Sequence, residues 1–125
     1  FRAEGSSHIL LHRQKRKVMN KYRNIPVVID GIRFASKAEG RRYSELKLLE
    51  KAGEISKLEL QPRYKIIVEG ILICTYVADF KFEQRHKSGM FFTVVEDVKG
   101  ILTPIYKLKK KLVKAVCGVD IKEVK

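Results

Sequence analysis

The chain has 125 residues, of which 45% are hydrophobic and 33% are charged. This length supports one hydrophobic core, and no apolar run approaches the roughly 20 residues of a membrane span. There are 27 Lys and Arg residues against 14 Asp and Glu residues, a net charge of +13. This charge predicts a nucleic acid as the partner rather than a membrane, and we expect a cytoplasmic location. Because aromatic content is only 9% and Trp is absent, contacts with the phosphate backbone are favoured over base stacking.

The N-terminal part of the chain divides into a basic segment and a predicted hairpin. Residues 1–18 show no periodicity, and we expect either a flexible basic arm or residues left over from recombinant expression. Residues 19–125 are expected to form the folded domain. Within it, the apolar runs Ile25–Ile29 and Ile32–Phe34 flank Asp30-Gly31, which is a preferred dipeptide of the type I′ hairpin turn.

A helix is predicted over residues 36–52. Ser36 and Glu39 have the spacing of a capping box, in which each side chain bonds the backbone of the other residue. Gly53 follows as the stop signal. Tyr43, Leu46 and Leu49 supply an apolar stripe.

Three strands are predicted next, at Tyr64–Val68, Ile71–Ala78 and Met90–Lys99. The second is apolar on both faces, which is typical of a central strand covered on both sides. Thr103-Pro104 begins a second helix that ends at Gly118, with Ile105, Leu108, Leu112, Ala115 and Val116 as its buried stripe, and a last strand follows at Val119–Val124. The order predicts an α/β domain, with an N-terminal hairpin followed by a mixed sheet flanked by two helices.

Four residues suggest chemistry: Glu39, Asp79, Asp97 and Lys99. Asp79 and Asp97 are expected on neighbouring antiparallel strands, where their carboxylates can share Mg²⁺, with Mn²⁺ as a substitute. Glu39 and the backbone carbonyl of Val98 are further candidate ligands. A bound metal lowers the pKa of a water and polarises a phosphoryl oxygen, and Lys99 would stabilise the charge on the phosphate.

Strand alternation separates two neighbouring carboxylates of the third strand. Asp97 and Lys99 share one face, while Glu96 points to the other and is expected to pair with a basic residue of a flanking helix. Three of the four candidates also have a structural reading, whereas Asp79 on an apolar strand is harder to explain in this way. Asp97 and Lys99 form a salt-bridged strand end in that reading, and Glu39 only caps its helix.

The basic faces of the two predicted helices are candidates for nucleic-acid binding. On the second helix, the lysines outside the apolar stripe are expected to contact the phosphates of a nucleic acid. The default alternative is that such a lysine run is only a solvated helix face. The candidates on the two helices are Arg41, Arg42, Lys107, Lys110, Lys111 and Lys114.

Asp79 followed by Asp97-Val98-Lys99 resembles the signature of the PD-(D/E)xK nuclease superfamily. Ser36-x-x-Glu39 resembles the helix-borne glutamate of Holliday junction resolvases and transposon-end nucleases, and Gln61-Pro62 is similar to the tract before their first core strand. Tracts such as Glu96–Gly100 look like those of small phage-encoded members. One difference is Ala78, where the family usually has Pro. The resemblance implies a restriction-endonuclease-like α-β-β-β-α-β core.

The expected function is a metal-dependent DNA endonuclease acting on branched or replicating phage DNA in an infected bacterial cell. Opposed cuts need two active sites, so we expect a homodimer, with a phage or host recombination or replication protein as a possible partner. One alternative is a non-catalytic basic DNA-binding accessory protein of recombination. Another is an RNA-processing nuclease.

Overall fold

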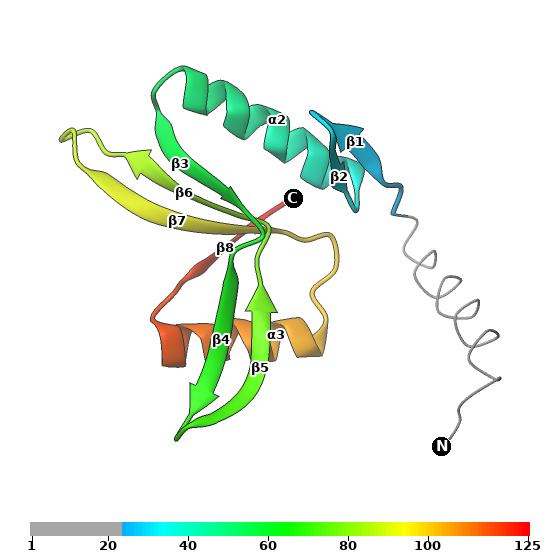
Figure 1. Cartoon of the computed structure of the whole chain (residues 1–125), viewed down its shortest axis with the longest axis vertical. Coiled ribbons are helices and arrows are strands. Elements are labelled where there is room, and N and C mark those ends of the chain that lie inside the picture. The colour runs from blue at the N-terminus through cyan, green and yellow to red at the C-terminus, as the bar shows by residue number, and fades with distance from the viewer. Residues whose placement is uncertain (1–23) are drawn as a thin grey trace. The chain divides into compact units, whose positions relative to one another are not determined.

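A computed structural model describes residues 24–125 (Figure 1). The described residues fall into two compact units, one that ends at Gly40 and one that spans Arg41–Lys125. The arm predicted at residues 1–18 lies outside the described residues. Over the described part of the chain, no helix is long and apolar enough to cross a membrane.

The first unit contains the predicted hairpin. Strands β1 (Val27–Ile29) and β2 (Ile32–Phe34) pair in antiparallel register. Asp30 and Gly31 have φ values of 54° and 76°, as a type I′ turn requires, so the prediction is confirmed. The hairpin packs on the first turn of helix α2, since a Cβ added at Gly40 would lie 2.6 Å from Cγ2 of Val27.

Helix α2 spans Lys37–Lys51, and the Ser36 half of the predicted capping box is confirmed. The backbone N–H of Glu39 donates to Oγ of Ser36 at 3.2 Å, which satisfies one of the free donors at the helix start. Gly53, with φ of 80°, follows the helix end. Tyr43 and Leu46 are buried as expected, whereas Leu49, the third residue of the predicted stripe, is 36% exposed.

The second unit has a mixed sheet with the order β3-β6-β7-β8. Its strands are β3 (Ile55–Leu60), β6 (Phe80–Arg85), β7 (Phe91–Val98) and β8 (Ile121–Val124). β8 runs parallel to β7, and the other neighbours are antiparallel. The predicted mixed α/β architecture is therefore confirmed.

The two helices cover opposite faces of this sheet. Glu96 of β7 bonds to Arg42 of α2 on one face. On the other face, Val95 clusters with Tyr106 and Val113, which belong to helix α3 (Pro104–Leu112) and the π-helical turn η1 (Val113–Cys117). Because successive strand residues point to opposite faces, Asp97 shares the α3 face with Val95.

A separate hairpin, formed by β4 (Arg63–Val68) and β5 (Ile71–Val77), lies beside α3 in Figure 1. Ile66 and Tyr76 anchor it to the core cluster. The prediction that β5 is a central strand covered on both sides is wrong. Ile71, Leu72 and Ile73 remain 64%, 55% and 53% exposed, because the centre of the sheet belongs to β6 and β7.

Five strands, rather than the predicted three, lie between the two helices. The two additional strands are β3 and β6. A bulge between Ser56 and Glu59, with Lys57 at a φ of 54°, breaks the alternation of β3. β6 begins only one residue after Asp79, where the chain passes from one sheet to the other.

The predicted start of α3 is confirmed, but its predicted buried stripe is shifted by about one residue. Oγ1 of Thr103 accepts the Tyr106 N–H at 3.1 Å, and Pro104 occupies the first turn. Tyr106 and Val113 are buried, whereas Ile105 and Leu108 are 68% and 58% exposed. Tyr106 can be buried because its hydroxyl has a hydrogen-bond partner, Glu123.

Candidate active site

Asp79 lies where the chain returns from the β4–β5 hairpin to the main sheet. Its backbone carbonyl accepts the Gln61 N–H at 2.9 Å, at the point where the chain leaves that sheet. Its own N–H donates to the Glu96 carbonyl at 3.0 Å. These two bonds hold the backbone of Asp79 at the points where the chain leaves and re-enters the main sheet. The Asp79 carboxylate therefore projects from backbone that the fold fixes, not from a flexible loop.

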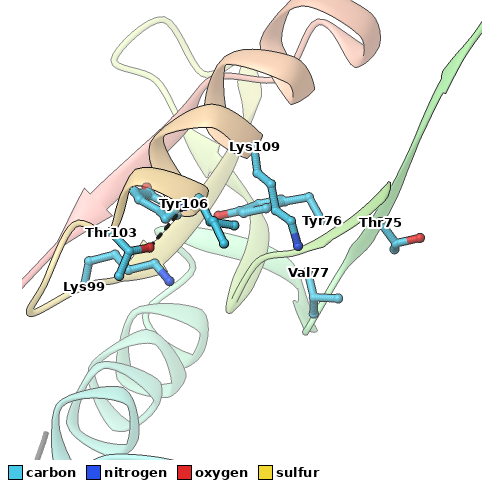
Figure 2. Close-up of a pocket in the computed structure, with 8 residues that line it drawn as sticks. Thr75, Tyr76, Val77, Lys99, Thr103, Tyr106 and Lys109 are labelled. Carbon is cyan, nitrogen blue, oxygen red and sulfur yellow. Dashed lines mark hydrogen bonds between the residues drawn. The ribbon is translucent and has the colours of Figure 1, made fainter. Parts of the chain in front are cut away.

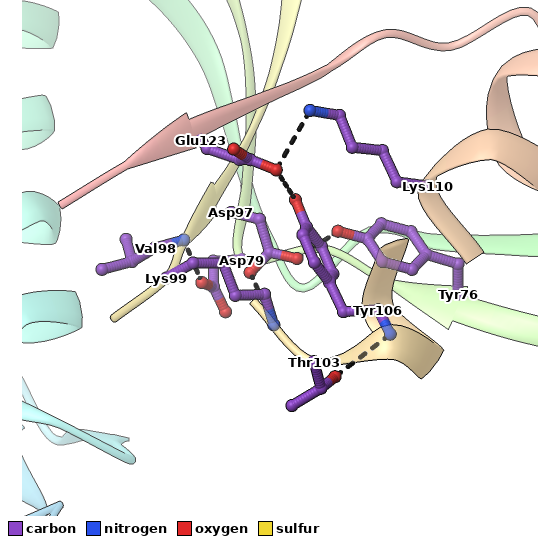
Figure 3. A network of polar contacts seen from close by, with 9 residues as sticks. All are labelled: Tyr76, Asp79, Asp97, Val98, Lys99, Thr103, Tyr106, Lys110 and Glu123. Atoms are coloured by element: carbon purple, nitrogen blue, oxygen red, sulfur yellow. Dashed lines mark hydrogen bonds and ion pairs between the residues drawn. The ribbon is translucent and has the colours of Figure 1, made fainter. Parts of the chain in front are cut away.

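The Asp79 carboxylate reaches the end of β7. Its Oδ2 accepts the backbone N–H of Val98 at 2.7 Å, and Figure 3 shows it beside Asp97 and Lys99. The three residues come from two neighbouring strand ends, as the sequence predicted for Asp79 and Asp97. A charge-assisted bond of this length is strong and orients the carboxylate.

Asp97 is the most buried acid on this face, with 2% of its surface exposed. The hydroxyl of Tyr76 donates to its Oδ2, and Nζ of Lys99 lies 3.5 Å from its Oδ1. Burial, reinforced by the neighbouring Asp79 carboxylate, raises the pKa of Asp97 to about 7, although Tyr76 and Lys99 act in the opposite direction. The site therefore concentrates negative charge that the protein compensates only in part.

Lys99 is positioned by an aromatic ring. Its Nζ lies 4.5 Å from the centroid of the Tyr106 ring, within cation–π range. The Tyr106 hydroxyl in turn donates to Oε2 of Glu123 at 2.9 Å, and Lys110 donates to the same oxygen at 3.0 Å. Lys110 and Tyr106 together hold the pKa of the Glu123 carboxyl below its usual range. A chain of contacts thus connects the candidate site with the surface of α3 (Figure 3).

Glu96 has the role that strand alternation assigned to it. It is fully buried, and Arg42 donates to both its oxygens, from Nε at 2.8 Å and from Nη2 at 2.7 Å. The same guanidinium donates to Glu45 at 3.1 Å, and the Glu96 bond raises the pKa of Arg42. Arg42, suggested by the sequence as a DNA contact, is therefore a structural residue, whereas Arg41 is exposed.

Four of the predicted DNA-binding residues do lie together. A groove of about 550 Å³ on the α3 surface is lined by Lys107, Lys110, Lys111 and Lys114. Lys110 pairs with Glu123, and Lys114 pairs with Asp120 at 2.8 Å. Within residues 24–125, neither Lys107 nor Lys111 forms a salt bridge. Lys107 still interacts electrostatically with Glu123, so Lys111 carries the least compensated positive charge of the groove.

Glu39, the remaining candidate, belongs to the first unit, whereas Asp79, Asp97 and Lys99 belong to the second. In the first turn of α2 its backbone has the predicted capping contact. Over residues 24–125, no group of three or more His, Cys, Asp or Glu side chains has the arrangement of a metal site. The second unit thus provides two carboxylates on its own.

These two carboxylates fit a magnesium ion by the chemistry of their donors. Mg²⁺ takes oxygen ligands, often only one or two protein carboxylates, and retains several waters. A cation near Asp97 would also oppose the effects that raise its pKa. The backbone carbonyl of Val98 lies on the same chain segment, and its N–H already orients Asp79.

Sequence reasoning missed the two tyrosines of the site. Tyr76 and Tyr106 are 4% and 6% exposed, and their ring centroids are 6.4 Å apart. Tyr76 precedes Asp79 by three positions on an apolar strand, and Tyr106 follows the helix cap at Thr103 by three. A buried hydroxyl needs a partner, so the available signal was Tyr76, which lies on an apolar strand close to the candidate acid Asp79.

Comparisons with known proteins identify a family. The family model described as "Protein of unknown function (DUF1064)" matches residues 19–123, which is most of the chain. Neither the search of curated proteins nor the search of solved structures finds a match. The chain therefore belongs to the DUF1064 family.

Proposed function

We propose that this protein is a metal-dependent endonuclease that hydrolyses phosphodiester bonds in DNA. The observation that carries the proposal is the placement of Asp79 and Asp97 next to Lys99 at two adjacent strand ends. A structural salt bridge accounts for Asp97 and Lys99, and the Asp79 carboxylate, held by the Val98 N–H, lies beside them. Two acids and a lysine at one point are suited to binding a cation and a phosphate together.

The finer fold assignment is also a proposal, namely a restriction-endonuclease-like domain of the PD-(D/E)xK type. It is supported by a mixed sheet with α2 on one face and α3 on the other, and by the sequence resemblance. In this assignment β6 and β7 present the two acidic residues, and the β4–β5 hairpin is an elaboration of the core.

Mg²⁺, with Mn²⁺ as a substitute, would be held by Asp79 and Asp97, and Glu39 and the Val98 carbonyl are the further ligands we propose. When bound, the metal supplies a water of lowered pKa and polarises a phosphoryl oxygen. The protein contributes orientation. Tyr76 holds the Asp97 carboxylate, and the Val98 N–H holds that of Asp79.

Lys99 would stabilise the negative charge that develops on the phosphate in the transition state. Its Nζ is only partly engaged, at 3.5 Å from Asp97, and its side chain is 30% exposed. The Tyr106 ring contacts the Lys99 ammonium from one side, so the ammonium is oriented and keeps its positive charge. Because Lys99 is already held in position, it needs little reorganisation when negative charge develops on the phosphate.

The DNA backbone would follow the groove formed by Lys107, Lys110, Lys111 and Lys114. Arg41, exposed on α2, is a further contact that we propose. The net charge of +13 supports a polyanionic substrate. We propose branched or replicating phage DNA in a bacterial cytoplasm, with a recombination or replication protein as partner. The exposed side chains Ile71, Leu72 and Ile73 support a homodimer.

A second candidate is a DNA-binding accessory protein of recombination without catalytic activity. The separation of the lysine groove on α3 from the two carboxylates favours it, because binding alone needs only the groove. The test is incubation with supercoiled plasmid, linear duplex and a four-way junction in Mg²⁺, Mn²⁺ or EDTA. Metal-dependent cutting supports the endonuclease, and binding without cutting supports the accessory protein.

A further inference from the structure

The helix α3 directs one lysine away from the groove on its surface. Lys107, Lys110, Lys111 and Lys114 line that groove, while Lys109 lines a different cavity, of about 290 Å³. The second cavity is also lined by Lys99, Tyr76, Tyr106, Val77 and Ile105. Figure 2 shows the side chain of Lys109 extending from α3 towards it. The lysines of α3 therefore line both a groove and a separate cavity on the second unit.

The charges in this cavity favour an anion. Lys109 is half-buried, and within residues 24–125 it has no carboxylate partner. Lys99 shares the cavity, and its ammonium is only partly compensated by Asp97 at 3.5 Å. Two ammonium groups that face one small space repel each other unless an anion lies between them. The hydroxyl of Thr103 is taken by the helix cap, so the two lysines are the main cationic groups.

The walls and the size of the cavity limit what the anion is attached to. A volume of about 290 Å³ lies at the lower end of small-molecule pockets, which begin near about 300 Å³. Val77 and Ile105 give it apolar sides. These features suit one sugar–phosphate unit of a strand and exclude a duplex.

We propose that this cavity binds a single nucleotide unit, with its phosphate on Lys109, directly next to the phosphate that Lys99 contacts. The inference rests on the proposed function and adds a substrate contact to the same site. Lys109 then fixes the position of the strand along the site, while Lys99 acts at the bond to be cut. The lysines of the groove bind the backbone farther away.

The test combines charge removal on the protein with charge removal on the DNA. Neutral methylphosphonate links replace single phosphates, one at a time, along one strand of a four-way junction. Dissociation constants are measured in the Asp79→Asn background, so that no strand is cut. The proteins compared carry Asp79→Asn alone, or with Lys109→Ala, Lys109→Arg or Lys111→Ala. Lys111 is a matched control because it lies on the same helix, lacks a carboxylate partner and lines the groove instead.

At one link the reference protein should lose about tenfold in affinity when the phosphate is neutral. With native DNA, the Lys109→Ala protein should bind about tenfold more weakly than the reference protein. A neutral phosphate at that link should not weaken its binding further. Lys109→Arg and Lys111→Ala should keep the sensitivity. Lys109→Ala should also lower the salt dependence of binding, with a slope smaller by about 0.9.

The proposal is overturned if Lys109→Ala keeps the sensitivity of the reference protein at every link, or if no single link matters. Failure of the proposed function is a separate result, because the scan does not depend on cutting. If the wild-type protein cuts nothing but the Lys109 coupling appears, the phosphate contact stands and the nuclease does not. If the wild-type protein cuts DNA and the Lys109 coupling is absent, the proposed nuclease activity stands and the phosphate contact on Lys109 does not.

Discussion

The hydroxyl of Tyr76 donates a hydrogen bond to Oδ2 of Asp97 in the interior of the second unit. Tyr76 belongs to the β4–β5 hairpin, and Asp97 belongs to the main sheet. The bond therefore joins the two sheets at the candidate site. It also opposes the effect of burial, because an accepted hydrogen bond favours the charged carboxylate.

Tyr76→Phe should lower the free energy of unfolding by about 1–2 kcal/mol, because it leaves a buried carboxylate with one donor fewer. Urea unfolding at pH 8 measures this value. Tyr64→Phe is the control, because Tyr64 is half-buried in β4 and its hydroxyl forms no hydrogen bond within residues 24–125. Equal effects of the two substitutions would contradict the role given to Tyr76.

The metal-free protein should become less stable as the pH rises from about 4 to about 7. The pKa of Asp97 is about 7 in the folded chain, against 3.8 for an ordinary aspartate. Between these values the folded state holds a proton that the unfolded state has released, so a rise in pH favours unfolding. Above pH 7 the effect of Asp97 is complete.

Asp97→Asn should remove this dependence and stabilise the metal-free protein at pH 8 by about 3 kcal/mol. Unfolding at pH 5 and at pH 8, with EDTA present, provides the comparison. Asp120→Asn is the control, since Asp120 is exposed and lines the α3 groove rather than the site. An Asp97→Asn protein with the same pH profile as the wild type would rule out this explanation.

Arg42→Ala should destabilise the protein by about 3–5 kcal/mol, because it leaves the buried Glu96 carboxyl without its main partner. Lys47→Ala, on the same helix, removes an exposed pair with Glu50 and should cost less than about 1 kcal/mol. Thermal unfolding distinguishes the two outcomes. If Arg42→Ala reduces DNA binding while leaving stability unchanged, Arg42 is a DNA contact after all.

A homodimer should depend on the exposed apolar residues of the β4–β5 hairpin. Leu72→Asp should convert the protein to a monomer, because it places a charge among Ile71 and Ile73. Leu48→Asp, at a position on α2 that is 68% exposed against 55% for Leu72, should leave the dimer intact. Light scattering coupled to gel filtration measures both masses. A wild-type monomer at every concentration would exclude the dimer.

Much of the local structure could be predicted because it depends on neighbouring residues. The Asp30-Gly31 turn, the Ser36 cap and the Thr103-Pro104 helix start each follow from short-range chemistry. The pairing of Glu96 with a helix residue followed from strand alternation alone. These features need no knowledge of the tertiary structure.

The errors arose where long-range packing decides. The apolar run of β5 indicated a central strand, yet the main sheet incorporates β6 in its place. On α3, two stripes have helical spacing, and hydrophobicity favoured the one containing Ile105. The protein buries Tyr106 instead, because Glu123 of a strand far along the chain accepts its hydroxyl. The local sequence pattern specifies neither which strand enters the main sheet nor which acid accepts the Tyr106 hydroxyl.

Cleavage of a labelled four-way junction and a supercoiled plasmid tests the central claim most directly, with binding measured on the same samples. With Mg²⁺ the wild-type protein should cut at least one substrate, and EDTA should abolish the activity. Asp79→Asn and Lys99→Ala should each reduce cutting by about 100-fold or more while retaining most of the binding. Lys65→Ala, a change at an exposed position on β4, should cut normally. Binding without cutting by the wild-type protein, in Mg²⁺ and in Mn²⁺, would contradict the account.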